Sequence, residues 1–302
     1  MGQHYVARFY LKAWTDEGML YRLNRTTGVI KKKGLGGVAN EKLFYRLSRL
    51  TSQEIEFLDG ALLEPCPEPL RSMQRQFLKL YTLAPNLRAK LTADQLDPNT
   101  KALLDDEIAM SGERHHSRIE GCLKPLVDLM LSGNTSFLSD PRRAADFLYA
   151  ICIQFTRTKR AREAAIRILG TKYQGCDPKR IWDVSSHIVA TSVARSLYVD
   201  RGGFRIVLVD NATATPFITA DQPIINIHDA QDGRPPDKLE YYYPLSPSKA
   251  MFYLEAQNAR CYGSNLSELA VNNFNILMMK NSYEQVYSDS AEYLEMIRRC
   301  DL

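Results

Sequence analysis

The stretch Phe204-Arg-Ile-Val-Leu-Val209 is dense in β-branched and large apolar residues and predicts a buried strand. It begins directly after Gly202-Gly203, where the sequence changes from helix-forming to strand-forming patterns. Three more strand candidates follow at residues 217–219, 224–227 and 250–254, separated by turn-rich pieces. Because these strands follow one another without alternating helices, we expect a mostly antiparallel sheet.

A second strand-forming region lies near the start of the chain. Residues 19–24 and 29–33 flank Arg25-Thr-Thr-Gly28, a turn whose glycine suits a positive φ, and together they predict a β-hairpin. Residues 4–14 precede it with apolar side chains at spacings of three and four, which indicates a short helix. The run Lys31-Lys-Lys33 either extends a phosphate-binding surface or protects an edge strand from aggregation, and we favour the edge strand.

The middle of the chain, residues 51–200, has helical patterns. Thr51 and the pair Asp140-Pro141 are helix-start signals. Helices are expected at 99–112, 114–132, 140–170 and 179–198, and closing helices near the end of the chain. The sequence therefore predicts one α+β domain over 1–302, with an N-terminal β-hairpin, a large helical middle and a C-terminal mostly antiparallel sheet. The helical block of about 51–200 is expected to pack on one sheet built from 19–33 and 204–254.

Composition excludes several classes of protein. The chain has 302 residues, 45% of them hydrophobic and 25% charged, with a net charge of +4, which rules out a disordered or fibrous molecule. Its six cysteines have no CxxC spacing, so a zinc ribbon is excluded, and Cys122 and Cys152 are expected to be buried free thiols. The sequence shows no signal peptide and no bilayer-spanning apolar run, so we expect a cytoplasmic protein without membrane contact. It also lacks the GxxxxGK[ST], GxSxG and HExxH motifs.

Several short motifs occur in an order that resembles the bacterial domain-of-unknown-function family 4238. They are His4-Tyr-Val-Ala-Arg-Phe-Tyr-Leu11, Val38-Ala-Asn-Glu-Lys-Leu-Phe-Tyr45, Arg157-Thr-Lys-Arg-Ala-Arg162, Pro216-Phe-Ile-Thr-Ala-Asp-Gln-Pro223, Pro244-Leu-Ser-Pro247 and Val271-Asn-Asn-Phe-Asn275. Ala7 and Lys159 stand where the family pattern has proline. The resemblance spans nearly the whole chain and implies a single-domain architecture, but no reaction.

The motif residues suggest a phosphodiester chemistry. Asp221 and Glu41 are candidate bases or ligands of Mg²⁺ or Mn²⁺, His4 is a candidate proton carrier, and Arg157 is a candidate clamp for phosphate charge. Contacts to phosphate or nucleic acid are expected from Arg8, Arg160, Arg162 and Asn275. The alternative is structural, because a histidine at a helix start can be a cap and an arginine within a helix can pair with a buried acid. Asp221 likewise either ligates a metal or accepts hydrogen bonds from its own turn.

Two helical surfaces carry further alternatives. Glu113, His116 and Glu120 have the spacing of one helix face, which suits a metal site, but a solvated charged face is the preferred interpretation. The basic run from Arg157 to Lys172, followed by Tyr173, either tracks phosphates or is a solvated face.

These observations leave three functional hypotheses. The first is a hydrolase of a phosphodiester or nucleotide, a nuclease-like effector against phage. The second is a non-catalytic binding or sensor module, in which the same residues form a buried polar network between the helical block and the sheet. The third is a toxin or antitoxin subunit that depends on a partner protein.

Overall fold

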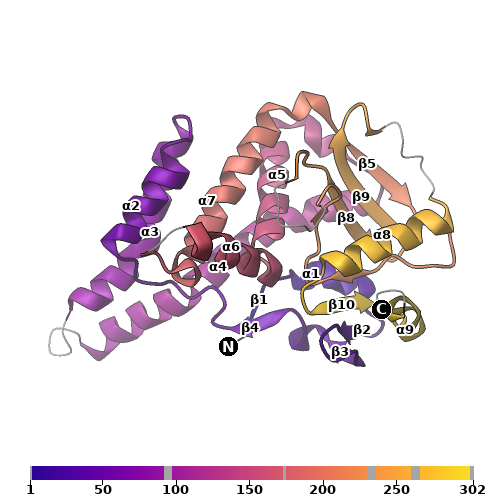
Figure 1. Cartoon of the computed structure of the whole chain (residues 1–302), viewed down its shortest axis with the longest axis horizontal. Helices are drawn as coiled ribbons and strands as arrows, with labels where there is room; N and C mark the ends of the chain where they lie inside the picture. The colour runs from indigo at the N-terminus through magenta and orange to yellow at the C-terminus, as the bar shows by residue number, and fades with distance from the viewer. Residues whose placement is uncertain (1, 92–96, 173–174, 230–235, 260–265, 300–302) are drawn as a thin grey trace.

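The computed structural model describes residues 2–91, 97–172, 175–229, 236–259 and 266–299. The helical block occupies the left and centre of Figure 1, the two four-stranded β-sheets lie at the right with the C-terminal helices, and a two-stranded sheet lies near the bottom centre. The order of elements confirms the α+β prediction, with β1 (Gly2–His4), α1 (Arg8–Leu11), η1 (Lys12–Trp14), β2 (Met19–Asn24), β3 (Ile30–Gly34), η2 (Leu35–Gly37) and β4 (Asn40–Lys42) first. The helical block follows, with α2 (Ser52–Leu58), η3 (Asp59–Leu63), α3 (Leu70–Lys90), α4 (Pro98–Leu131), η5 (Ser136–Ser139), α5 (Pro141–Thr156), α6 (Lys159–Lys172), α7 (Pro178–Val199) and η6 (Arg201–Gly203). The last part holds β5 (Phe204–Asp210), β6 (Thr219–Ala220), β7 (Ile225–Asn226), β8 (Tyr241–Ser246), β9 (Lys249–Glu255), α8 (Glu268–Asn281), β10 (Gln285–Ser288) and α9 (Ala291–Arg298).

The N-terminal segment is not one helix over 4–14. His4 ends β1 and pairs with Asn40 of β4, and the Tyr5 N–H donates to the Ala39 carbonyl at 3.0 Å. Only residues 8–14 turn helically, as α1 and η1. The physical reason is burial on all sides, since the consecutive residues Tyr5 and Val6 are both fully buried. An amphipathic helix would leave one of its faces in water, whereas an extended segment inside the core buries both.

The predicted hairpin is confirmed. β2 and β3 pair antiparallel with Leu23 opposite Ile30, and Gly28 in the turn has φ +67°. The sheet order is β3-β2-β10-β6, so Lys31, Lys32 and Lys33 lie on an edge strand, as preferred above.

The strands of 19–33 and 204–254 do not form one sheet. The hairpin takes its neighbour from β10, and only β6 from the later range joins that sheet. The remaining strands form a second sheet in the order β5-β9-β8-β7. β8 has no counterpart among the predicted strands, because Pro244 gives its sequence a turn-forming character, and the register is irregular just after that residue.

Two of the predicted helix boundaries are wrong. Residues 99–112 and 114–132 belong to the single helix α4, because Gly112 is a packing site and not a helix end. A Cβ at Gly112 would lie 2.5 Å from the Tyr45 carbonyl oxygen, so the missing side chain lets the chain at Tyr45 pack closely. The predicted helix 140–170 instead breaks at Arg157, and Thr158 starts α6 by accepting a hydrogen bond from the Ala161 N–H at 3.2 Å.

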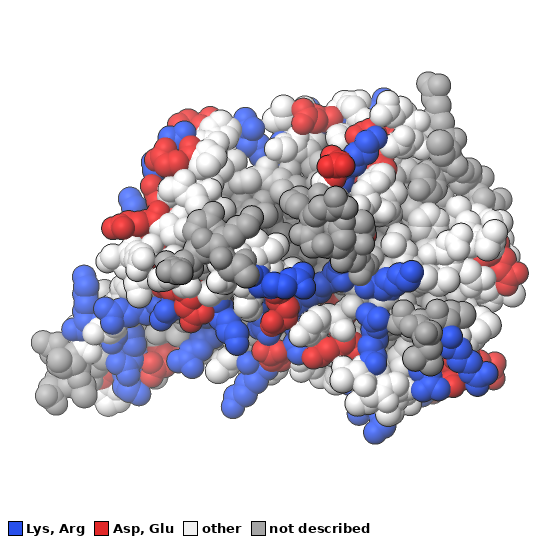
Figure 2. All heavy atoms as spheres, viewed as in Figure 1, with Lys and Arg blue, Asp and Glu red and all other residues white. Residues whose placement is uncertain are grey.

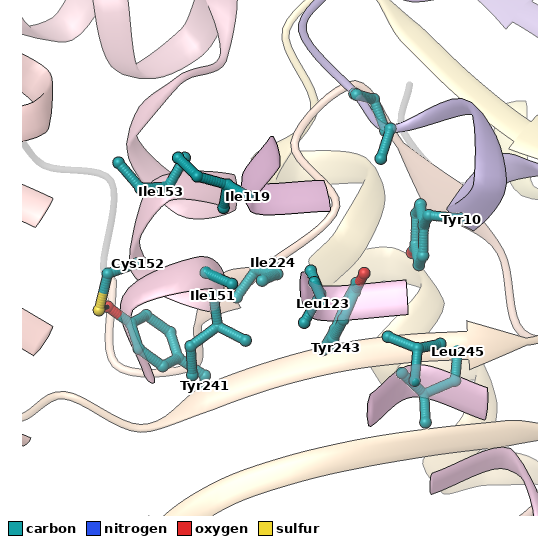
Figure 3. Packing of buried hydrophobic residues seen from close by; sticks show 14 of the residues in the cluster. Tyr10, Ile119, Leu123, Ile151, Cys152, Ile153, Ile224, Tyr241, Tyr243 and Leu245 are labelled. Atoms are coloured by element: carbon teal, nitrogen blue, oxygen red, sulfur yellow. Dashed lines mark hydrogen bonds between the residues drawn. The ribbon is translucent and has the colours of Figure 1, made fainter. Parts of the chain in front are cut away.

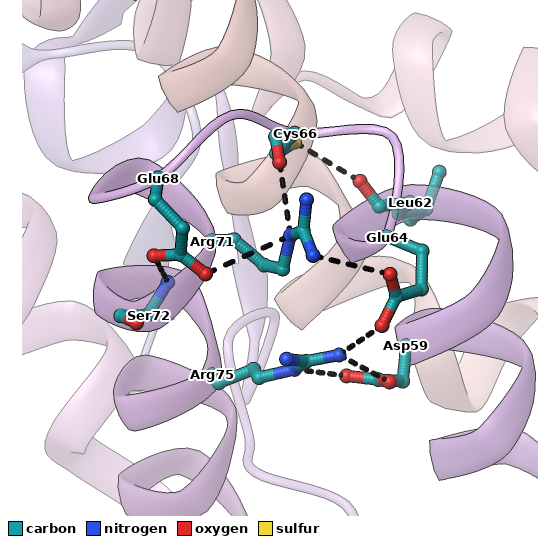
Figure 4. Close-up of polar contacts among 8 residues, drawn as sticks. All are labelled: Asp59, Leu62, Glu64, Cys66, Glu68, Arg71, Ser72 and Arg75. Atoms are coloured by element: carbon teal, nitrogen blue, oxygen red, sulfur yellow. Dashed lines mark hydrogen bonds and ion pairs between the residues drawn. The ribbon is translucent and has the colours of Figure 1, made fainter.

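The helical arm formed by α2, η3 and α3 is held by surface ion pairs (Figure 4). Arg75 binds both Asp59, at 2.7 Å, and Glu64, at 2.5 Å, while Arg71 donates to Glu64 at 3.2 Å and to the Cys66 carbonyl at 2.9 Å. Exposed ion pairs of this kind contribute at most about 1 kcal/mol each to folding stability. These pairs join residues on either side of the proline-rich connector between η3 and α3 and so hold this connector in place.

The largest apolar core joins the N-terminal segment to the helical block and to β8 (Figure 3). The Tyr10 ring stacks on Tyr243 with centroids 4.8 Å apart, and its hydroxyl donates to the Pro244 carbonyl at 2.8 Å. Leu123 of α4 and Ile151 of α5 are fully buried in the same cluster. The motif that begins at His4 is therefore part of the junction between helices and strands.

The two cysteines that were expected to be buried differ. Cys152 is buried as predicted, but Cys122 is exposed, because it lies on the outer face of α4.

Within the described part of the chain, none of the helices is both long and apolar enough to cross a membrane.

Candidate functional site

Asp221 is held by the backbone of a neighbouring loop. Its carboxylate, 1% exposed, accepts hydrogen bonds from the N–H groups of Tyr283, Glu284 and Gln285 at 2.7, 2.7 and 2.9 Å. Burial raises its pKa to about 6, although these three hydrogen bonds oppose the shift. The arrangement ties the end of β6 to the start of β10, and its donors belong to residues 283–285 and not to the turn of Asp221 itself, which the structural alternative had named.

Glu41 faces the basic helix α6. Lys159 Nζ lies 3.0 Å from Glu41 Oε2, and Arg162 Nη1 lies 3.5 Å from Oε1. Burial alone would raise the pKa of Glu41, but the hydrogen bond from Lys159 and the charge of Arg162 lower it. Lys159 also binds Glu284 at 3.3 Å, so this ion-pair group reaches the loop that holds Asp221.

The other predicted phosphate contacts have mixed environments. Arg160 pairs with Asp229 at 3.0 Å, and the Arg162 guanidinium lies 4.5 Å from the centre of the Phe44 ring. Arg8 is exposed at the start of α1. On the face seen in Figure 2, basic and acidic side chains are interleaved and form no single positive field. The Lys172 side chain and Tyr173 lie outside the described residues.

Asn275 is fully buried and engaged with backbone and tyrosine groups. Its Nδ2 donates to the Pro216 carbonyl at 2.8 Å and to the Tyr293 hydroxyl at 2.7 Å, and its Oδ1 accepts from the Ile218 N–H at 3.0 Å. These bonds join α8 and α9 to the segment before β6, and they use both amide donors.

Arg157 occupies a different and more unusual environment. The side chain is 1% exposed, and its Nη2 donates to Glu120 Oε1 of α4 at 2.7 Å. Its Nε donates to Gln154 Oε1 at 3.2 Å, while Nη1 has no hydrogen-bond partner in the described structure. Burial lowers the pKa of Arg157, but Tyr45 and the carboxylates of Glu120 and Glu113 together raise it, and the net shift is upward. The guanidinium therefore stays charged in the interior with one donor group unused.

The residues around this guanidinium form what we call the Arg157 cluster: Arg157, Gln154, Glu113, Glu120, His4, His116, His187, Tyr45 and Tyr243. α4 contributes Glu113, His116 and Glu120 on one face, as their spacing predicted. The preferred interpretation of that face as solvated is wrong, since His116 is buried and the two carboxylates border Arg157.

Glu113 and His4 have pKa values shifted toward each other. Burial and the nearby Glu120 raise the pKa of Glu113, whose carboxylate accepts a hydrogen bond from the His4 backbone N–H. Burial lowers the pKa of His4, as do the charges of Arg8 and Arg157, although its bond to the Leu35 carbonyl at 3.3 Å opposes this. An acid with a raised pKa beside a base with a lowered pKa is a pattern typical of acid–base sites.

Two imidazoles close the inner side of the cluster. His116 of α4 and His187 of α7 stack with centroids 4.9 Å apart, and the Tyr45 ring lies 4.0 Å from His116. Burial lowers the pKa of His187 to about 3 and also depresses the pKa of His116 strongly, so both rings are neutral.

Unpaired polar atoms concentrate in this cluster. Of the nine buried side-chain nitrogen and oxygen atoms without a partner in the described residues, six belong to it: Arg157 Nη1, Glu113 Oε2, His116 Nδ1, His187 Nδ1, Gln154 Nε2 and Tyr243 OH. The other three are on Arg22, Gln74 and Tyr242. Because leaving such a group unpaired costs about 1–3 kcal/mol, we expect these six atoms to bind ordered water or a ligand.

The structure thus separates the predicted site residues. It brings His4 and Arg157 together, but Glu41 and Asp221 lie with Lys159 and Glu284 in a second polar group, and Asn275 lies elsewhere. Over the ranges that the structure describes, no three His, Cys, Asp or Glu side chains are arranged to hold a metal ion. Sequence reasoning missed Tyr45, Tyr243 and His187, because their partners are distant in the chain and no spacing marks them.

The fold and the cluster define an α+β protein whose helices enclose a buried guanidinium beside carboxyl and imidazole groups. A family model described as protein of unknown function (DUF4238) matches residues 2–181 and 182–292, and the chain belongs to this family. The resemblance drawn from the short motifs is therefore confirmed. No curated protein matches the chain, and no solved structure does.

Proposed function

We propose that the protein is a binding module that takes up a small polar ligand in the Arg157 cluster. The single observation that carries the proposal is the concentration of six unpaired buried polar atoms around one guanidinium. A ligand with an acceptor atom for Arg157 Nη1 and a donor for Glu113 Oε2 would satisfy groups that the chain leaves unpaired. We also propose a cytoplasmic location, supported by the free buried thiol of Cys152.

Access to the cluster is supported by the exposure of its outer members. The Glu120 side chain is 23% exposed, and His4 and Glu113 are half-buried, whereas Arg157 and His116 are buried. The outer carboxylates and imidazole would meet a ligand first, and the guanidinium would fix its acceptor end.

Hydrolysis of a phosphodiester or nucleotide in a bacterial cell, in defence against phage, is the second candidate. The observation that favours it is the pair Glu113 and His4 beside Arg157, with their opposed pKa shifts. In this version Arg157 neutralises phosphate charge, and Glu113 and His4 exchange protons with the reacting oxygens. Acid–base work then falls to Glu113 in place of Asp221, whose carboxylate is fully engaged with backbone N–H groups.

Thermal unfolding with AMP, GMP and inorganic phosphate tests the binding proposal, because a ligand that prefers the native state raises the melting temperature. Tyr243→Phe removes one unpaired hydroxyl of the cluster, and Tyr242→Phe removes an unpaired hydroxyl in the other core, so the two variants are matched. We expect Tyr243→Phe to lower the ligand-induced shift and Tyr242→Phe to leave it unchanged. Equal shifts in the wild type and both variants, or no shift with any probe, would contradict the proposal.

A further inference from the structure

A groove of about 330 Å³ lies between α7 and the proline-rich connector that joins η3 to α3. In Figure 1 this connector is the turn at the top of the helical arm, beside α7. The connector side of the lining includes Leu62, Pro65 and Pro67, and the α7 side includes Val189, Val193 and Arg195. None of the lining residues belongs to the Arg157 cluster.

Polar contacts hold the connector wall in one shape (Figure 4). Arg71 Nε donates to the Cys66 carbonyl at 2.9 Å, and the Cys66 thiol donates to the Leu62 carbonyl at 3.2 Å. Cys66 Sγ also lies 3.4 Å from Ser192 Oγ of α7, so the connector and the helix are in contact beside the groove. The groove is therefore formed by the fold and needs no ligand to open it.

The apolar side chains of the lining keep accessible surface. Val189 is 41% exposed, and Leu62 and Val193 are partly exposed. Pro65 and Pro67 are exposed as well. Because a ligand with an apolar part would remove this surface from water, its binding along the groove is favoured.

Arg195 adds a positive charge to this apolar groove. Among the described residues of the lining it is the only charged one. Its side chain is exposed and forms no ion pair or hydrogen bond with the described part of the chain. Because a planar guanidinium binds a carboxylate in a bidentate manner, the groove complements an apolar molecule that ends in a carboxylate.

The connector offers few backbone groups to a peptide. Three of the five residues 65–69 are prolines, which lack an N–H. The carbonyls of Leu62 and Cys66 accept from the Cys66 thiol and Arg71 Nε, and the Pro67 carbonyl accepts from the Arg71 N–H. A peptide in the groove would leave its own amide groups without partners along this wall, which weakens binding. An alkyl chain has no such groups, so a small molecule fits the groove better than the carboxyl end of a peptide.

We propose that this groove binds a small alkyl carboxylate, with the carboxylate on Arg195 and the chain along Val189, Val193 and the connector prolines. The volume is at the lower end of the range of about 300–1,000 Å³ that is usual for small-molecule sites, which favours a short chain. The proposal does not depend on the function proposed above.

Calorimetric titration with octanoate, octan-1-ol and acetate at about pH 7.5 tests this assignment. We expect octanoate to bind at least fivefold more tightly than octan-1-ol, which lacks the charge, and at least tenfold more tightly than acetate, which lacks the chain. Arg195→Gln should weaken octanoate binding at least threefold and leave octan-1-ol binding unchanged. Val189→Ser should weaken the binding of both at least twofold.

Each variant has a matched control. Arg201→Gln changes a surface arginine bonded to the Tyr198 carbonyl, and Val199→Ser changes a valine of α7 that is 58% exposed. Neither Arg201 nor Val199 lines the groove, so both controls should bind octanoate as the wild type does. Because Arg195 and Val189 are exposed, their variants should fold normally, and thermal unfolding checks that they do.

Three results would overturn the proposal. The first is the absence of octanoate binding to the wild type. The second is an octanoate affinity that is unchanged in both Arg195→Gln and Val189→Ser. The third is octanoate binding that is lost in Tyr243→Phe but kept in the two groove variants, which would assign the carboxylate to the Arg157 cluster and support the first proposal instead.

Discussion

Arg157 and Glu120 form an ion pair across the interface of α4 and the α5–α6 break, with Nη2 2.7 Å from Oε1 and the guanidinium 1% exposed. The break between α5 and α6 falls at Arg157 itself, so the end of one helix places the guanidinium against the face of another. The ion pair therefore lies where the chain breaks between α5 and α6, and it joins this break to the Arg157 cluster.

Removing the acid of this pair should destabilise the fold. Glu120→Ala leaves a buried guanidinium without its closest carboxylate, and breaking a buried pair from one side costs about 3–5 kcal/mol. The expected loss of unfolding free energy here is smaller, about 2–3 kcal/mol, because Glu120 is 23% exposed and water can replace its carboxylate beside Arg157. Urea unfolding measures the change, and a loss below about 0.5 kcal/mol would show that the pair does not hold α4 to α5.

Gly112 should not tolerate alanine, although alanine is the better helix former. The added Cβ would meet the Tyr45 carbonyl oxygen at 2.5 Å, and overpacking of this kind costs about 1–3 kcal/mol. Gly121 in the same helix has nothing within 4 Å of its Cβ position, so Gly121→Ala should be stabilising by up to about 1 kcal/mol. Urea unfolding of the two variants should therefore show a loss of stability for Gly112→Ala and a gain for Gly121→Ala. A gain of stability for Gly112→Ala would contradict the close contact with Tyr45.

Asp221 should make stability depend on pH. Its pKa is raised to about 6 in the folded protein, so the folded state binds more protons than the unfolded state between about pH 4 and 6. The contribution of this group is thus fully present below about pH 4 and is lost as the pH rises through 6. Asp221→Asn removes this dependence, although its amide nitrogen opposes the backbone N–H donors and lowers stability at every pH.

The measurement is the difference in unfolding free energy between wild type and Asp221→Asn from pH 4 to pH 7. We expect the advantage of the wild type to shrink by up to about 3 kcal/mol over this range. An advantage that grows with pH would mean that the three N–H donors hold the pKa below its usual value.

The cap of α6 offers a smaller test. Thr158 accepts from the Ala161 N–H and donates to Gln222, so Thr158→Ala removes a helix cap and a link to the loop before β7. A loss of about 1–2 kcal/mol is expected from thermal unfolding. Thr156→Ala serves as control, since Thr156 is bonded to the Ile153 carbonyl within its own helix, at 3.4 Å.

The fold was predictable where local chemistry decides it. The Gly28 turn, the Thr51 cap and the Asp140-Pro141 start all form as their residue types indicate, since each depends on neighbours within a few positions. Helix α4 was predicted as two helices, and the close contact of Gly112 with Tyr45 that lies at the junction is not visible in the sequence. Strand β8 was missed because its pairing with β7 and β9 overrides the turn character of Pro244.

The candidate site was predictable only in part, for the same reason. The spacing of Glu113, His116 and Glu120 placed them on one helix face, but which face is buried depends on Arg157, which follows Glu120 by 37 positions. Asp221 was singled out as a turn carboxylate, and its partners in residues 283–285 are more than 60 positions away. Contacts across such separations leave no periodicity in a single sequence.

The central claim is that the Arg157 cluster is a binding site and not scaffold, and Glu113→Gln tests it most directly. The raised pKa of Glu113 means that its contribution to stability is lost as the pH rises above about 4.5, and glutamine keeps the shape without the charge. The measurement is the unfolding free energy at pH 7.5, with and without a ligand that shifts the wild type. We predict equal or higher stability for Glu113→Gln and a reduced ligand effect, because residues of a site are often costly to the fold. A loss of more than about 1 kcal/mol with the ligand effect intact would contradict the claim and mark Glu113 as scaffold.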